Sequence, residues 1–298
     1  GTLIGLGRMR ALLALQILLN GLNLILDLWF VLGLGWGVRG IALGTVLAEW
    51  TAFALGLSVV LRLIRPRPTD GMPLWSWPDI FVRRQWLRMV TTNTDILWRT
   101  LALLAGFAWF TNQGARFGDA TLAANHILLQ FTILSAFFLD GFAFVLEAEV
   151  GHAAGAGHVN RFRATVWRST LLAGATAALL ALAVAGLGPW FVQRLTTLAT
   201  VRELALAHLP WAALYVVCSF PAFQLDGIFV GTSESRPMRD ATLMALLTFL
   251  GATWVTVARW GNDGLWLAFV CFVIARGAFL GAYLPGLARR LRLEAMEA

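Results

Sequence analysis

The sequence is poor in the residue types on which many soluble and secreted folds depend. It contains no lysine, charged residues make up only 13% of its 298 residues, and there are two cysteines. Cys218 and Cys271 lie inside apolar runs, without the cysteine set of a disulfide framework or the spacing of a zinc site. The four histidines form no HExxH pattern, and no Walker loop occurs. We therefore expect no resident cofactor, no metal centre and no ATP site, and the pattern does not favour an enzyme.

Apolar residues are what the sequence has in abundance. They make up 59% of the chain, and the mean hydropathy is +0.73, far above the average for globular domains. Several apolar runs exceed the roughly 18 residues that a bilayer-spanning helix needs. Helices satisfy their own backbone hydrogen bonds in lipid, so the sequence predicts an all-α integral membrane protein, a polytopic helix bundle. We expect about eight spans, at residues 11–32, 38–63, 90–112, 119–150, 164–187, 204–231, 238–258 and 263–287.

The net charge of +7 comes entirely from arginines, which cluster in short loops between the apolar runs. If successive loops alternate sides, sixteen arginines fall on one side and five on the other. The arginine-rich side of a membrane protein is normally cytoplasmic. We therefore expect a multi-pass protein of the bacterial inner (plasma) membrane with a cytoplasmic C-terminus. The same distribution argues against a nucleic-acid partner.

Two parts of the sequence echo each other at a nearly constant offset. The pattern at residues 1–10 recurs at 227–239, and the pattern that starts at Trp36-Gly37 recurs at Trp260-Gly261. Because both copies have the same orientation, the pattern indicates a parallel repeat, with two similar lobes of six helices each. The first residues resemble the end of a helix, so we expect an N-terminally truncated chain that would have twelve helices when complete.

The repeat predicts how the chain divides. Residues 1–64 would be the C-terminal part of the first lobe, with the end of helix 4 and helices 5 and 6. Residues 65–89 would be a cytoplasmic linker between the lobes, Pro-rich at its start and interfacial in its second half. Residues 90–298 would be the second lobe, with helices 7 to 12.

Four polar residues interrupt the first full span. Gln16, Asn20, Asn23 and Asp27 are spaced by four, three and four residues, which places them on one face of a helix. A carboxylate inside a span costs about 3 kcal/mol on insertion scales, so it normally faces a partner or a water-filled cavity. The alternative is that these groups form structural hydrogen bonds between helices. We favour that alternative, or a place in the cavity wall, for Gln16 and Asn20.

The next span offers Thr45 and Glu49 at depths similar to those of Asp27 and Asn23. If the two helices face each other there, carboxylate, amide and hydroxyl oxygens converge. Such oxygens suit a proton or a hard cation. We therefore predict a cation- or proton-binding site at Asn23, Asp27, Thr45 and Glu49.

The second half of the chain also carries polar residues within its spans. Asp95 and Arg99 are four residues apart, which suggests an ion pair within one helix. Asp140 lies towards the inner end of its span, where lining a cavity and structural pairing are equally good interpretations. We expect Arg276, inside the last span, to neutralise one of the acidic residues.

A proline-containing stretch follows at 221–227, PAFQLDG. Pro221 kinks a helix and frees a carbonyl group, and broken helices of this kind line transport pathways. The predicted substrate cavity therefore comprises Asn20, Asp140, Gln224 and Asp226.

The chain resembles the MATE transporters (multidrug and toxic compound extrusion). The resemblance rests on NxxxD at Asn23–Asp27, the run from Gly37 to Trp50, LDGFA at Leu139–Ala143 and FQLDGIFVG at Phe223–Gly231. The last two runs look most like the DNA-damage-inducible F branch. The resemblance covers essentially the whole chain.

The resemblance implies a secondary active efflux transporter that exports cationic or amphipathic compounds by antiport with H⁺ or Na⁺. It implies that Asn23, Asp27 and Thr45 belong to the ion site, where Na⁺ is the only metal expected. Asp226 would match an acidic residue of a second-lobe cation site in another branch, but the span 90–112 lacks the glutamate of that site. The expected partners are small cationic or amphipathic substrates and the lipid bilayer, and we expect a monomer. The alternative is a lipid-linked precursor flippase with a related two-lobed scaffold, whose cavity would be strongly cationic.

Overall fold

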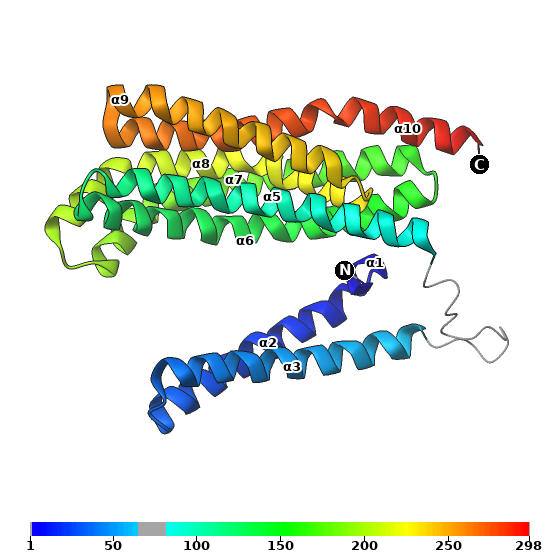
Figure 1. Cartoon of the computed structure of the whole chain (residues 1–298), viewed down its shortest axis with the longest axis horizontal. Coiled ribbons are helices and arrows are strands. Elements are labelled where there is room, and N and C mark those ends of the chain that lie inside the picture. Colours follow the sequence, from blue (N-terminus) through cyan, green and yellow to red (C-terminus); the bar gives the residue numbers. More distant parts are fainter. Residues whose placement is uncertain (1, 65–81, 298) are drawn as a thin grey trace. The chain divides into compact units, whose positions relative to one another are not determined.

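The computed structural model describes residues 2–64 and 82–297, and within these ranges the chain is built from helices (Figure 1). It divides into two compact units, Gly1–Trp86 and Leu87–Ala298. Most of the predicted linker, residues 65–81, lies outside the described residues. Residues 83–89 of that predicted linker form the start of the helix α5 (Arg83–Ala115).

The first unit is a helical hairpin. It comprises α1 (Thr2–Gly5), α2 (Met9–Leu28), a π-helical turn η1 (Trp29–Gly33) and α3 (Gly37–Ile64). Gly35 and Gly37 have positive φ and reverse the chain between η1 and α3. The ring of Phe30 stacks on both Trp29 and Trp36, which fixes this turn. A π-helical turn inside an α-helix often marks a functional position, and here it begins two residues after Asp27.

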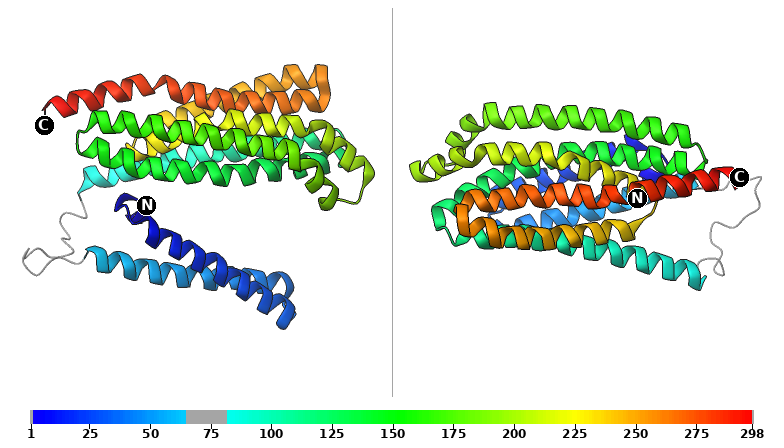
Figure 2. Two further views of the ribbon diagram at one scale, coloured as in Figure 1. Left: turned by 180° about the vertical axis from the view of Figure 1, so that it is seen from behind. Right: turned by 90° about the horizontal axis from the view of Figure 1, so that it is seen from above.

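The second unit is a bundle of long helices. In chain order these are α5 (Arg83–Ala115), α6 (Asp119–Gly155), α7 (Val159–Leu195), α8 (Ala199–Gly231), α9 (Ser235–Ala282) and α10 (Leu284–Glu297). The two views in Figure 2 show α9 folding back on itself, with α10 continuing the direction of its second arm. The reversal lies at Gly261, whose φ of +56° suits glycine.

Among the described residues, six helical segments are long and apolar enough to cross a membrane. They are Met9–Gly33, Gly37–Leu63, Asp119–Gly155, Val159–Leu195, Ala199–Gly231 and Ser235–Leu291. The last segment contains both arms of α9, which correspond to the predicted spans 238–258 and 263–287. The predicted span 90–112 lies in α5, which has the length but is not among the six, because polar residues interrupt its apolar character.

Glycine allows α6 and α8 to pack unusually closely. A Cβ atom on Gly227 would lie 2.5 Å from the carbonyl oxygen of Ala143, and one on Gly231 would lie 2.5 Å from that of Glu147. The two glycines are four residues apart and so lie on the same face of α8. Small residues with this spacing are a common device for close helix packing in membranes.

An aromatic core joins α5 to the two arms of α9. Phe110, Phe249, Trp266, Phe269 and Phe272 are almost completely buried and contact one another. This packing positions the inward-facing polar residues of α5 and α9.

Candidate functional site

The first candidate site surrounds Asp27 in the α2–α3 hairpin. Asp27 is half-buried, and its Oδ1 atom is buried without a hydrogen-bond partner among the described residues. That oxygen lies against the backbone of α3 at Gly44, where a side chain would occupy the same space. Burying an unpaired charged oxygen is costly. The arrangement therefore leaves Asp27 able to gain from a proton or a cation.

Asn23 and Thr45 are joined one helical turn away from Asp27. The Nδ2 of Asn23 donates to the Oγ1 of Thr45 at 3.1 Å, and Thr45 in turn donates to the carbonyl of Ile41 at 3.0 Å. The contact links α2 to α3 and orients both side chains. Asn23 and Asp27 share a face of α2, so this hydrogen bond and the Asp27 carboxylate lie on the same side of the helix.

The structure places the other residues of the predicted stripe differently. Glu49 is exposed and, with Trp50 and Phe53, lines a surface depression. Gln16 and Asn20 are exposed on α2. The described residues give none of these three polar groups a hydrogen bond to Asn23, Asp27 or Thr45. The hairpin thus brings together Asn23, Thr45 and the backbone beside Asp27, while Glu49 is exposed.

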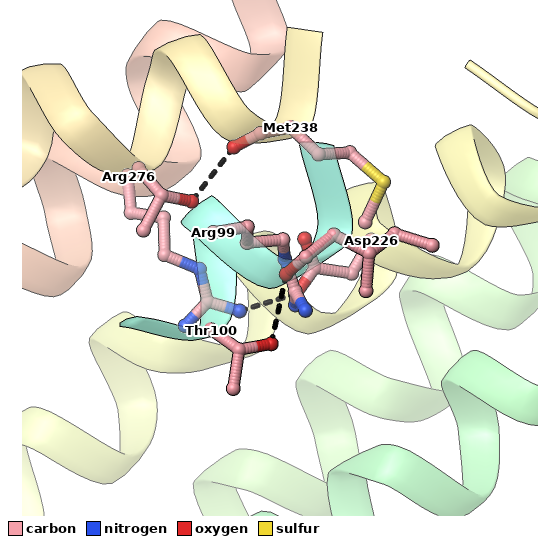
Figure 3. A network of polar contacts seen from close by, with 7 residues as sticks. Arg99, Thr100, Asp226, Met238 and Arg276 are labelled. Carbon is pink, nitrogen blue, oxygen red and sulfur yellow. Dashed lines mark hydrogen bonds and ion pairs between the residues drawn. The ribbon is translucent and has the colours of Figure 1, made fainter. Parts of the chain in front are cut away.

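The second candidate site is centred on Asp226 in the second unit. Its Oδ2 accepts hydrogen bonds from the Nη2 atoms of both Arg99 on α5 and Arg276 on α9. Figure 3 shows the two guanidinium groups converging on this carboxylate. Arg276 is only 6% exposed, and its guanidinium also lies 5.5 Å from the centroid of the Phe223 ring. The three charges therefore form a largely buried triad with a formal charge of +1.

A cavity of about 340 Å³ opens beside this triad, between α5, α6, α8 and α9. Asp140 reaches it from α6, so Asp140 and Asp226 share this cavity. Its remaining wall is mostly aromatic and aliphatic. The principal aromatic residues are Phe107, Phe137, Tyr215, Phe223 and Phe272.

Gln224 is not among the residues that line this cavity. It is 2% exposed, and its Oε1 accepts a hydrogen bond of 2.9 Å from the Oγ of Ser169 on α7. Gln224 and Asp226 are two positions apart, which places them on different faces of α8. Gln224 therefore lies at the α7–α8 contact, away from the triad.

The expected pairing of Asp95 with Arg99 is wrong. Asp95, 4% exposed, accepts hydrogen bonds from Arg239 and, at 2.9 Å, from the Oγ of Ser235. Both donors lie on α9, so Asp95 joins two helices rather than two turns of one helix. Arg99 instead contacts Asp226. Sequence spacing suggested that Asp95 and Arg99 pair with each other, but in the structure each pairs with a residue of another helix, Asp95 with Arg239 on α9 and Arg99 with Asp226 on α8.

Comparisons with known proteins agree with the fold. Residues 113–255 match the MatE family model. The chain is 34% identical to the DNA damage-inducible protein F of Escherichia coli strain K12 over 284 residues, which covers 95% of this chain and 60% of that protein. It is 26% identical to the chloroplastic protein DETOXIFICATION 44 of Arabidopsis thaliana, covering 86% of this chain and 47% of the relative. The chain thus spans about half to three fifths of the length of these relatives.

Solved structures of transporters have the same fold. A mutant of the Vibrio cholerae MATE transporter VcmN superposes with a TM-score of 0.85, at 18% identity, over 96% of this chain and 64% of that one. A transporter of the MOP superfamily from Pyrococcus furiosus superposes with a TM-score of 0.80, at 17% identity, over 94% and 62% of the two chains. The binding pocket of the Pyrococcus transporter is described as having reverse polarity, which suggests a different function for that protein.

The class that these matches define is one of fold: the helical fold of solved membrane transporters. Within that class, the chain is similar to MATE transporters: the MatE family model matches its residues 113–255.

Proposed function

We propose that the protein is a secondary active exporter that moves small amphipathic compounds out of the cell in exchange for H⁺ or Na⁺. The observation that carries the coupling mechanism is the buried, unpartnered Oδ1 of Asp27 beside the Asn23–Thr45 hydrogen bond. The similarity to MATE transporters supports transport, and the Asp27 carboxylate supplies a group whose charge an ion can neutralise. The cavity beside Asp226 is the proposed place for the transported compound.

Coupling follows from the cost of burying the Asp27 charge. When Asp27 is ionised, packing its carboxylate against α3 at Gly44 leaves a charged oxygen without a partner. A bound proton or Na⁺ removes much of that cost, so occupancy favours the conformation in which the hairpin is closed around Asp27. For Na⁺, the oxygen atoms of Asn23 and Thr45 are the further ligands proposed. Release of the ion favours the alternative conformation, which is the requirement for alternating access.

The orientation of the protein and the membrane in which it works are also proposed. The arginine distribution supports a bacterial inner membrane protein with a cytoplasmic C-terminus, and we propose that it works as a monomer. Nothing in the proposed cycle requires ATP.

A flippase for lipid-linked precursors is the second candidate, because two arginines reach the cavity. A pyrophosphate group needs an excess of positive charge. Here Asp140 and Asp226 balance Arg99 and Arg276, so the four formal charges sum to zero. The charge balance favours an exporter of amphipathic compounds.

Transport by the purified protein in proteoliposomes tests the proposal. A fluorescent amphipathic dye is loaded, and a pH gradient or a Na⁺ gradient is imposed in separate experiments. We expect dye export that depends on one of the two gradients and stops when an ionophore collapses it. Dye transport that is independent of both gradients would contradict ion-coupled export. Transport of a lipid-linked pyrophosphate without transport of any dye would contradict it too.

A further inference from the structure

The cavity beside Asp226 carries two arginine side chains with much of their hydrogen-bonding capacity unused. A guanidinium has five N–H donors. Within the described residues, Arg99 and Arg276 each donate one hydrogen bond, and both bonds go to the same oxygen of Asp226. The Nε atoms of both arginines are buried and unpartnered. Asp226 therefore holds the two guanidinium groups together but accepts only one hydrogen bond from each of them.

This arrangement changes what Asp226 offers to a ligand. Its Oδ2 is shared between two positive charges, and the three groups together have a formal charge of +1. A cation that approached Asp226 would meet Arg99 and Arg276 as well. An anionic group in the cavity would meet the guanidinium groups of both Arg99 and Arg276, and paired guanidinium groups bind carboxylates strongly.

Asp140 adds a second carboxylate to the same cavity. It lies on α6 and lines the cavity, and the described part of the chain gives it no hydrogen bond or ion pair. It is half-buried, so part of its carboxylate remains accessible from the cavity. The cavity thus has a positive region on α5, α8 and α9 and a negative group on α6.

The rest of the wall suits an aromatic body. Phe107, Phe137, Tyr215 and Phe272 line the same cavity as the charged groups. Aromatic rings bury large apolar areas and prefer stacked or edge-to-face contacts with other rings. At about 340 Å³, the cavity lies within the range of small-molecule sites.

We propose that this cavity binds an aromatic zwitterion, with its carboxylate on Arg99 and Arg276 and its cationic group facing Asp140. The inference rests on the proposed export function and names its substrate class. It also narrows the sequence-based expectation of cationic or amphipathic substrates. A compound with both charges matches both regions of the wall, whereas a simple cation matches only Asp140.

Three related dyes separate these possibilities by their charges. Rhodamine 110 has a free carboxylate and a cationic ring system, rhodamine 123 is its methyl ester and lacks the carboxylate, and fluorescein has the carboxylate but no cationic group. Binding to the purified protein is measured by fluorescence anisotropy, without any ion gradient. We expect the wild-type protein to bind rhodamine 110 at least about tenfold more tightly than rhodamine 123, because hydrogen bonds between charged groups are worth roughly 1.5–3 kcal/mol.

Variants assign the preference to residues. Arg276→Gln and Arg99→Gln should each reduce the preference for rhodamine 110 over rhodamine 123 to near unity. Asp140→Asn should weaken rhodamine 110 binding without weakening fluorescein binding. Arg161→Gln is the matched control, because Arg161 forms an exposed ion pair with Glu149. It should leave all three affinities unchanged.

Arg99→Gln decides the test if Arg276→Gln does not fold, since the Arg99 side chain is 19% exposed and less embedded than that of Arg276. Equal affinity of the wild-type protein for rhodamine 110 and rhodamine 123 would overturn the proposal. A preference that survives Arg99→Gln would overturn it too. Dye binding is measured without a gradient, so a failure of ion-coupled export in proteoliposomes would not change the binding result. Conversely, equal binding of the two rhodamines would not contradict export of other compounds, which the transport experiment tests.

Discussion

Asp226 on α8 and Arg276 on α9 form a hydrogen-bonded ion pair in the interior of the second unit, with the side chains only 12% and 7% exposed. Arg99 from α5 shares the same carboxylate oxygen. One carboxylate therefore ties together three helices that are far apart in the sequence. An intact buried ion pair adds little to the free energy of unfolding. Removing one partner lowers that free energy strongly, because the other charge is left buried and unpaired.

Removing the carboxylate should therefore destabilise the second unit. Asp226→Asn leaves two guanidinium groups facing each other, and we expect a loss of about 3–5 kcal/mol. Thermal unfolding in detergent, followed by circular dichroism, measures the effect. Glu149→Gln is the control, because it breaks only the exposed pair with Arg161 and should cost less than about 1 kcal/mol. Equal effects of the two substitutions would contradict the structural role of the triad.

The pairing of Asp95 can be tested by double-mutant cycles. Asp95→Ala and Arg239→Ala should be strongly non-additive, with a coupling energy of about 0.5–3 kcal/mol, because the two side chains contact each other. The pair Asp95 and Arg99 should be nearly additive, within about 0.5 kcal/mol. The unfolding free energies of the single and double variants give the coupling energy of each pair. Coupling in the second cycle instead of the first would restore the pairing expected from sequence spacing.

The close contact between α6 and α8 predicts a steric cost at Gly227. Gly227→Ala places a methyl group against the carbonyl of Ala143 and should destabilise the protein by about 1–3 kcal/mol. Gly251→Ala is the matched control, because a Cβ there has nothing within 4 Å. It should be neutral or stabilise helix α9 by about 0.5–1 kcal/mol. Thermal unfolding compares the two, and a tolerated Gly227→Ala would show that the helices are not held at this distance.

Gly44 offers a test of the Asp27 site that changes no ionisable group. Gly44→Ala fills the space that the Asp27 carboxylate occupies beside α3, so we expect the gradient-dependent transport rate to fall by at least about tenfold, equivalent to about 1.4 kcal/mol. Gly21→Ala on α2 is the control, since a Cβ at that position has nothing within 4 Å. Dye export from proteoliposomes measures both. An unaffected Gly44→Ala variant would mean that the position of Asp27 against α3 does not matter for coupling.

The sequence predicted the architecture well because membrane helices have strong local signals. Length, apolar content and the glycine-rich turns located most of the helices, including the two arms of α9 on either side of Gly261. Helix spacing also indicated that Asn23 and Asp27 share a face. The family resemblance led to the same family as the comparisons.

What the sequence could not predict were contacts that depend on packing between distant helices. Asp95 and Arg99 satisfy a helical spacing, yet each finds its partner on another helix. Glu49 shares a face of α3 with Thr45, yet it is exposed, and the described residues give it no hydrogen bond to Asn23, Asp27 or Thr45. The one available signal for the triad was charge: Asp226 and Arg276 are oppositely charged residues inside apolar runs, and such residues normally pair.

Ion coupling through Asp27 is tested most sharply by transport with the Asp27→Asn variant. The substitution keeps the size of the side chain but removes its titratable charge, so the site no longer changes charge when an ion binds. In proteoliposomes, we expect Asp27→Asn to insert normally and to lose gradient-driven dye export, while Gln16→Ala, exposed on the same helix, retains it. Gradient-driven export by Asp27→Asn at the wild-type rate would show that this carboxylate does not couple the ion to transport.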